Sequence, residues 1–294
     1  MKDYILSCCS TADLKKEHLD EKDIRYIYFH YSLDGVAYYD DLGQTMPLDR
    51  FYKTMADGAK TSTSQINISE YLDYFSSFLS EGKDVLHVCL SSGLSGSYNC
   101  AVNAANIARE RFPGRKIYVV DSLGASSGYG LLIDAMADLR NNGMEIEELR
   151  DWAEANKLSV HHLFFSTDLS YYVKGGRISR AAGLAGGILG ICPVLHVDAS
   201  GRLIPIMKAR SKKKAMREIV DLMVKNARGG PDYSGKCFIS HSACLEDACA
   251  VADLVKDRFA KLGGVVINDI GTTIGSHTGP GTTAMFFWGS ERVK

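Results

Sequence analysis

The stretch "DVLHVCLSSGLSGSYNCAVNAANIARERF" (residues 84–112) contains a short apolar run, a turn rich in serine and glycine, and a long helix-like pattern. The apolar run is typical of a buried strand, and the polar turn leads directly into the helix. A strand, a turn and a helix in this order are the unit of parallel α/β sheets. The stretch therefore predicts the fold class, and its turn raises the question of which small polar group is bound there.

Similar patterns flank this stretch on both sides. The segments "YILSCC" (4–9) and "KIYVVDS" (116–122) are predicted buried strands, each followed by a helix-like stretch. The segment "HHLFFSTD" (161–168) is a further predicted buried strand. The segment "RYIYFHYSLDGVAYYDD" (25–41) alternates around Leu33-Asp34-Gly35, which predicts a hairpin.

The second half of the chain continues with strands and two long amphipathic helices. Residues 193–210 predict two strands joined by a turn at 198–201, and residues 212–227 and 245–262 predict the helices. Further strands are predicted at 236–242, 265–270 and 284–289. We therefore predict an α/β protein of two lobes, an N-terminal lobe with a parallel sheet over residues 1–160 and a C-terminal α/β lobe over residues 161–294.

The composition is that of a soluble globular protein, with 46% hydrophobic and 23% charged residues among 294. The 34 basic and 35 acidic residues nearly cancel, so no overall field recruits nucleic acid or a membrane surface. The longest uncharged run, residues 181–195, is short for a membrane span and predicts a tightly packed buried segment. The first twenty residues lack the apolar core of a secretory signal, so we expect a cytoplasmic protein.

The eight cysteines include no CxxC pair, and we expect reduced, mostly buried thiols. His241 and Cys244 lie close together in the sequence, but no second pair follows at ligand spacing. The sequence therefore predicts no metal site.

The turn before the helix at residue 97 allows three interpretations. Ser95 lies in "GLSGS", which lacks the final glycine of a nucleophile elbow, and His87 is at the wrong end of the strand to act as its base. A phosphate loop would need a lysine after Gly96. What remains is a helix N-terminus with free N–H groups and hydroxyls, which favours a single anion or is simply capped by serine.

Three other segments are polar enough to take part. Residues 60–70, "KTSTSQINISE", form a predicted loop with four consecutive hydroxyl residues, and Asn67 and Glu70 have capping-box spacing. Residues 274–282, "IGSHTGPGT", place His277 in a glycine-rich loop. Residues 208–217 carry six basic residues near the start of a helix, which indicates an anionic partner or a solvated helix face. Aromatic residues are not interleaved there, which argues against nucleic acid.

Taken together and in this order, these segments resemble the DegV family of bacterial lipid-binding proteins, which includes the fatty acid-binding subunits of bacterial fatty acid kinase. The matching segments are "TSQIN" (63–67), "SSGLSGSY" (91–98), "VVDS" (119–122), "KGGRIS" (174–179), "KARSKKKA" (208–215) and "GSHTGPG" (275–281). The resemblance implies a two-lobed DegV-like α/β fold that holds a long-chain fatty acid such as palmitate, stearate or oleate. It implies no nucleotide, metal or other cofactor.

The resemblance also implies which residues bind the ligand. Thr63 and Ser95 would hold the carboxylate, with Ser64 and Gly96 beside them, and His277 would lie near the same head group. A separate ATP-dependent kinase would phosphorylate the bound acyl group in pathways that have one. Five basic residues are expected to contact this partner or the phosphorylated product: Arg177, Lys208, Arg210, Lys212 and Lys213.

Two positions depart from the family pattern. Cys9 stands where the family has an aspartate, so a role for an N-terminal acid near the head group is in doubt. Ile66 replaces the usual proline, and the preceding "TS" duplicates the motif. Either Thr61 or Thr63 is therefore the head-group ligand.

These observations predict a non-catalytic carrier that holds an acyl chain in a buried pocket and presents its carboxylate to a partner. Burial of the chain would supply most of the affinity, and the polar donors would fix its orientation. One alternative is a lipid-acting hydrolase or acyltransferase that uses Ser95. The other is a lipid-responsive regulatory module whose output is a protein contact.

Overall fold

The computed structural model describes residues 4–179 and 191–293, so residues 181–190 of the predicted packed segment lie outside the described residues. The strands are β1 (Tyr4–Cys9), β2 (Ile24–Ile27), β3 (His30–Leu33), β4 (Val36–Tyr39), β5 (Thr61–Ser64), β6 (Asp84–Cys89), β7 (Ile117–Asp121), β8 (Val160–Ser166), β9 (Cys192–Val197), β10 (Leu203–Ala209), β11 (Cys237–His241), β12 (Val265–Asp269) and β13 (Thr282–Trp288). The helices are α1 (Lys16–Glu21), α2 (Leu48–Ala56), α3 (Ile68–Leu79), α4 (Ser97–Arg111), α5 (Ser127–Asn141), α6 (Ile146–Asn156), α7 (Ser170–Lys174), α9 (Lys212–Asn226), α10 (Leu245–Arg258) and α11 (Thr272–Thr278). Three short 3₁₀ helices are η1 (Ser10–Ala12), η2 (Lys157–Ser159) and η3 (Gly230–Asp232).

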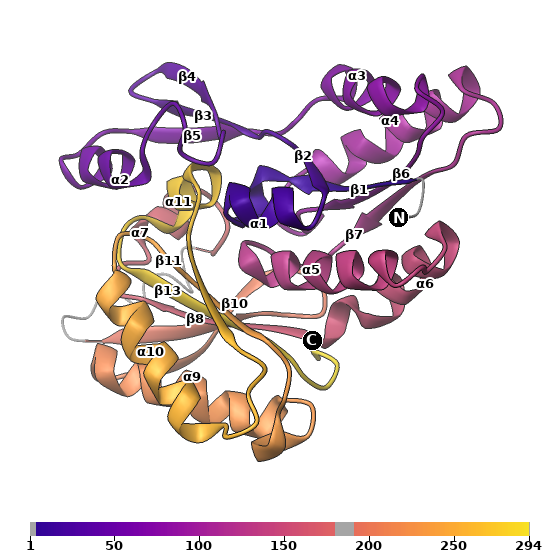
Figure 1. Cartoon of the computed structure of the whole chain (residues 1–294). Helices are drawn as coiled ribbons and strands as arrows, with labels where there is room; N and C mark the ends of the chain where they lie inside the picture. Colours follow the sequence, from indigo (N-terminus) through magenta and orange to yellow (C-terminus); the bar gives the residue numbers. More distant parts are fainter. Residues whose placement is uncertain (1–3, 180–190, 294) are drawn as a thin grey trace.

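The first sheet has the order β2-β1-β6-β7, and all of its strands are parallel. Both of its faces are covered, because α3 and α4 pack on the outer face and α5 lies on the inner side (Figure 1). Burial on both faces explains why β1 and β6 are almost continuously apolar rather than alternating. The predicted parallel-sheet lobe is confirmed.

The second sheet has the order β10-β9-β8-β13-β11-β12, antiparallel except for the β11–β12 pair. Helices α9 and α10 cover its outer face, and α5 packs against β8, β11 and β13 on the inner face (Figure 1). The mixed α/β fold with two sheet-based lobes is therefore confirmed. The start of β8 coincides with residue 160, and the division of the chain into two domains there stays a prediction.

Helix α5 lies between the two sheets, and apolar residues from both belong to one continuous core. Its sequence suits this position, because residues 128–133 are an uncharged run of Gly, Tyr, Leu and Ile and all of them are buried. Glycines let it approach its neighbours closely. A Cβ atom at Gly128 would lie 2.1 Å from His162 Nε2, and one at Gly130 would lie 2.8 Å from the carbonyl oxygen of Ala12.

A small third sheet, β4-β3-β5, stands beside the first (Figure 1). The predicted hairpin is confirmed as β3 and β4, with Asp34 and Gly35 both at positive φ as a tight hairpin turn requires. The capping box of Asn67 and Glu70 at the start of α3 is also confirmed. The prediction of a loop at residues 61–64 was wrong, because these residues form edge strand β5 and pair with β3. Their alternating burial and β-branched threonines suit a half-buried strand.

The expected loop around His277 is helical at residues 272–278, the second departure from the sequence analysis.

Two buried carboxyl groups accept hydrogen bonds from the first residues of this helix. The Gly271 N–H donates to Asp13 Oδ1 at 3.0 Å, the Thr273 N–H to Asp40 Oδ2 at 3.2 Å, and the Thr272 hydroxyl to Asp40 Oδ1 at 2.8 Å. Carboxylates at a helix N-terminus satisfy unpaired N–H groups and complement its dipole. A sequence pattern cannot show them, because they lie more than 230 residues away.

In residues 4–179 and 191–293, no helix combines the length and the apolar character needed to cross a membrane.

We predict that Asp13→Ala destabilises the protein by about 2 kcal/mol, because the buried donors Gly271 N–H and Ser126 Oγ–H lose their shared acceptor. The measurement is the midpoint of urea unfolding. The control Asp73→Ala, on the exposed side of α3, should change stability by no more than about 0.5 kcal/mol. Equal midpoints for both variants would contradict the anchoring role of Asp13.

Candidate functional site

A cavity of 320 Å³ lies among β5, α11, the loop before α4 and the inner face of the second sheet. Its volume is at the lower end of the range for small-molecule sites, which is about 300–1,000 Å³. Much of the described lining is apolar and comes from strands β8, β9, β10 and β13 of the second sheet, from α11 and from the segments that follow β2, β6, β7 and β12. These apolar residues are Phe29, Leu90, Leu94, Ala125, Phe164, Val197, Leu203, Ile270, Ile274, Ala284 and Phe286.

The cavity also brings together polar residues that are far apart in the sequence. All five residues expected at the head group line it, and so does Arg177. The polar lining residues from the matching segments are Thr63, Ser64, Gln65, Ser95, Gly96, Arg177, His277 and Thr278. None of the described lining residues is acidic, so Arg177 gives this part of the cavity a positive charge.

Arg177, His277 and Thr63 form a hydrogen-bonded chain that ends at the cavity. The Arg177 guanidinium donates to His277 Nδ1 at 3.3 Å, and His277 Nε2 lies 2.7 Å from Thr63 Oγ1. Because a guanidinium can only donate, Nδ1 must accept, and the proton of the neutral imidazole is on Nε2. The ring therefore donates to Thr63 Oγ1, and the hydroxyl hydrogen of Thr63 is free to point to a ligand.

The electrostatics agree with this assignment. Burial, and then the charge of Arg177, lower the pKa of His277 to about 4. Burial also lowers the pKa of Arg177, but a guanidinium stays charged at neutral pH. The site at pH 7 therefore holds a neutral histidine and a cationic arginine, which suits one anion.

Arg177 is held in place by two backbone carbonyls. Its guanidinium donates to Gly175 O at 2.6 Å and to Leu94 O at 3.1 Å, which joins the end of α7 to the loop before α4. A Cβ atom at position 175 would lie 2.2 Å from His277 Nδ1. Glycine is therefore required here for the close approach of the ring.

Ser95 lies in the loop between β6 and α4, where its Oγ accepts the Ser97 N–H at 3.2 Å. This bond leaves the Ser95 hydroxyl hydrogen free to donate. None of the described histidines hydrogen-bonds to Ser95. In particular, His87 lies 2.8 Å from Ser7 Oγ, and His277 is engaged by Thr63. No described histidine is therefore hydrogen-bonded to Ser95 in the way that a base activates a nucleophilic serine.

The two candidate threonines have different surroundings. Thr61 donates to the Ser276 carbonyl at 3.3 Å and does not line the cavity, whereas Thr63 does. The arrangement favours Thr63 as the residue that faces a ligand.

The other basic residues of the expected group lie outside the described lining of the cavity. Lys208, Arg210 and Lys213 are exposed, and Lys212 forms an ion pair with Asp247 at 2.7 Å. The sequence analysis grouped Arg177 with these residues, but the structure separates it from them.

Seven polar lining residues were not assigned to the site by the sequence analysis: Gln65, Ser126, His162, Tyr172, Thr273, Thr278 and Thr282. Gln65 lies against Gly96, where a Cβ atom would be 2.3 Å from Gln65 Oε1. His162 donates to the Val160 carbonyl and accepts the Ala125 N–H, so both ring nitrogens are used internally. The alternation of His162 and Phe164 along β8 was a period-two signal for a shared face.

The low pKa of His277 predicts a pH dependence of stability. The folded state binds the His277 proton only near pH 4, whereas the unfolded state binds it near pH 6.5. The unfolding free energy should therefore fall as the pH drops through this window, by on the order of 2–3 kcal/mol from this residue.

In His277→Gln this contribution should disappear, so the variant should lose less stability than the wild type between about pH 7 and pH 4. The measurement is urea unfolding of both proteins across this range, with circular dichroism at neutral pH to verify the fold. Identical slopes for the two proteins would be evidence against a buried neutral His277.

Comparison with known proteins gives consistent matches along the whole chain. The family model described as "Uncharacterised protein, DegV family" matches residues 9–289. A DegV domain-containing protein of Clostridium perfringens is 33% identical over 292 residues, which is 99% of each chain. A stearic acid-binding protein from Eubacterium ventriosum has a similar structure, with a TM-score of 0.85 and 26% identity, over 97% of this chain and 98% of that chain.

The Fatty Acid Kinase (Fak) B3 protein of Streptococcus pneumoniae, loaded with linoleic acid, has a TM-score of 0.84 to this structure. The match covers 98% of this chain and 99% of that chain at 22% identity, so it establishes a shared fold only.

Proposed function

The chain belongs to the DegV family, and we propose that it is a non-catalytic carrier that binds one long-chain fatty acid and presents its carboxylate to a partner protein. The observation that carries this proposal is the position of the Arg177–His277–Thr63 chain beside an apolar cavity. The similarity to a stearic acid-binding protein supports the choice of ligand.

The apolar lining would supply most of the affinity. A saturated acid of sixteen carbons has fourteen methylenes, and burial of each contributes about 0.8 kcal/mol, or roughly 10 kcal/mol before the cost of ordering the chain. Aromatic walls such as Phe164 and Phe286 suit an acyl chain, and the absence of acidic groups from the described lining suits its carboxylate.

The carboxylate would accept hydrogen bonds from the hydroxyls of Thr63 and Ser95. Arg177 would compensate its charge through space, and His277 would keep the Thr63 hydroxyl in the donating orientation. Ser64 and Gly96 line the same region and would shape it. With no described histidine hydrogen-bonded to Ser95, this geometry supports holding the acid rather than transferring the acyl group.

The partner we propose is a cytoplasmic ATP-dependent fatty acid kinase. The family resemblance is the basis for this choice, and the fold shared with the Fak B3 protein is consistent with it. Lys208, Arg210 and Lys213 are exposed and have no acidic partner among the described residues, so they are free to meet an acidic surface or an acyl phosphate. Lys212 already pairs with Asp247 and would contribute less.

We predict that Ser95→Ala weakens the binding of stearate by about ten- to a hundredfold, because one charge-assisted hydrogen bond is lost. Thr63→Ala should behave similarly, and the double variant should be non-additive because both hydroxyls serve one carboxylate. The measurement is equilibrium binding of stearate and of methyl stearate. The methyl ester should bind more weakly to the wild type and lose little further affinity in either variant.

The matched control is Ser92→Ala, in the same loop but outside the described cavity lining, which should bind stearate as the wild type does. Hydrolysis of an acyl ester is measured in parallel. If Ser95→Ala bound stearate as tightly as the wild type, the proposal that Ser95 holds the carboxylate would be wrong. Ester hydrolysis that depends on Ser95 would indicate an enzyme instead.

For the basic segment we predict that Lys208→Glu combined with Lys213→Glu leaves stearate affinity unchanged but lowers acyl phosphate formation by the cognate kinase about tenfold at low salt. Lys225→Glu, at the other end of α9, is the control and should have little effect. Equal rates of acyl phosphate formation with the wild type and the double variant would show that the segment is a solvated surface with no role in this step.

A further inference from the structure

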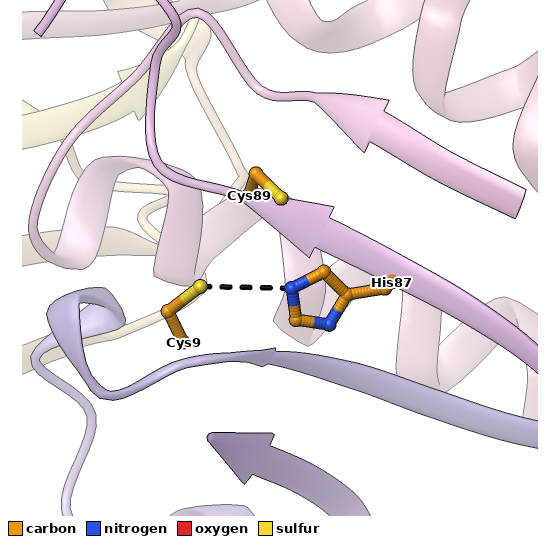
Figure 2. Close-up of side chains that lie close together, drawn as sticks. All are labelled: Cys9, His87 and Cys89. Atoms are coloured by element: carbon orange, nitrogen blue, oxygen red, sulfur yellow. Dashed lines mark hydrogen bonds between the residues drawn. The ribbon is translucent and has the colours of Figure 1, made fainter. Parts of the chain in front are cut away.

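Strands β1 and β6 bring three metal-ligating side chains together in the core of the first sheet. The two strands are parallel neighbours, and Cys8 pairs with Val88 at the end of their common register. Cys9 and Cys89 are each the next residue, and His87 lies two residues before Cys89 on the same face of β6. Figure 2 shows the side chains of Cys9, His87 and Cys89 pointing toward one another.

The distances are close to those of a metal-ligand set. The three ligand atoms lie within 4.8 Å of one another, and Cys9 Sγ is 3.6 Å from His87 Nε2. In a tetrahedral zinc site the bonds are about 2.3 Å to sulfur and about 2.05 Å to nitrogen, which places two ligand atoms about 3.6–3.8 Å apart. The sulfur–nitrogen pair already has this separation, and the other pairs need to contract by no more than about 1 Å.

All three side chains have no solvent exposure, which restricts the charge that the site can carry. Two thiolates and a neutral imidazole sum to two negative charges, so a divalent ion makes the buried group neutral. A monovalent copper ion would leave one buried negative charge, which is costly without a partner. Thiolate and imidazole ligands suit zinc among the common divalent ions.

The surroundings of the three residues also resemble an ordered ligand set. His87 Nδ1 lies 2.8 Å from Ser7 Oγ, and this hydrogen bond orients Nε2 toward the sulfurs. The rings of Tyr71 and Phe75 meet the imidazole edge to face, each with its centroid 5.4 Å away. The imidazole is therefore held in position before any ion binds.

We propose that Cys9, His87 and Cys89 form a buried metal site that binds one zinc ion. The site lies outside the cavity lining, and the proposal does not depend on fatty acid binding. Three protein ligands leave the fourth position of a tetrahedral ion to water or to the Tyr71 hydroxyl, which is 3.4 Å from Cys9 Sγ and 3.9 Å from Cys89 Sγ.

The position of the site links it to the loop before α4. The Tyr71 hydroxyl also lies 2.8 Å from Ser97 Oγ, and the Ser97 N–H donates to Ser95 Oγ. A zinc ion would thus join the ends of β1 and β6 directly behind the loop that carries Ser95.

The first test is metal analysis of the full chain, purified anaerobically in reductant without chelators after growth with added zinc. We expect about one zinc per chain by mass spectrometry of the metal content. Cys9→Ser and Cys89→Ser should each lower zinc affinity by at least about a hundredfold, and Ser7→Ala by about tenfold. Cys8→Ser is the matched control, because Cys8 is also buried on β1 but faces the opposite side of the strand, and it should retain zinc.

The second test does not require any variant to fold. Cobalt(II) added to reduced, zinc-free wild type should give thiolate-to-cobalt charge-transfer bands and the intense visible bands of a tetrahedral site. Zinc should then displace the cobalt and raise the melting temperature.

Three outcomes would overturn the proposal. They are a wild type that takes up neither zinc nor cobalt, equal zinc retention in Cys9→Ser and Cys8→Ser, and a Cys9–Cys89 disulfide in protein kept under reductant.

Discussion

Two buried carboxylates, Asp13 and Asp40, hold the start of α11, and the arrangement of the cavity depends on this contact. Asp13 follows β1, Asp40 follows the β3–β4 hairpin, and α11 belongs to the C-terminal part of the chain. Burial disfavours the charged form of both carboxyl groups and thereby raises the pKa of each. Hydrogen-bond donors offset part of this cost. The donors are the N–H groups of the helix start and the hydroxyls of Thr272 and Ser126. These hydrogen bonds therefore satisfy the N–H groups at the start of α11 and join three parts of the chain.

The position of α11 in turn decides the chemistry of the site. It places His277 between Arg177, which follows α7, and Thr63, which lies on β5. Because the guanidinium fixes the tautomer of the ring, the hydroxyl hydrogen of Thr63 points away from His277. A substitution at the buried start of α11 would therefore displace His277 and change the orientation of the Thr63 hydroxyl, although the substituted residue makes no hydrogen bond to Thr63.

Much of the fold could be predicted from the sequence, because strands buried on both faces and long amphipathic helices leave clear local patterns. Strand β5 could not, since Thr61–Ser64 has no apolar residue and becomes a strand only by pairing with β3. The site residues came from motifs, and motifs could not separate Arg177, which lines the cavity, from Lys213, which does not. Ligand spacing could not reveal the cluster at Cys9, because Cys9 lies about eighty residues before His87 and Cys89 and meets them only through the parallel pairing of β1 and β6.

The two hydroxyls proposed to bind the carboxylate, those of Thr63 and Ser95, are held in a similar way. Thr63 ends a chain of hydrogen bonds that runs back through His277 to a guanidinium held by two carbonyls. Ser95 is connected through Ser97 to Tyr71, whose hydroxyl touches the sulfur of Cys9 in the core. Hydrogen bonds within the protein thus hold both hydroxyl groups in position before a ligand binds. The entropy lost on binding therefore comes mainly from ordering the acyl chain rather than the protein. In the proposed complex, such preorganisation would let two neutral hydroxyls and the guanidinium of Arg177 orient a ligand whose affinity comes from its apolar part.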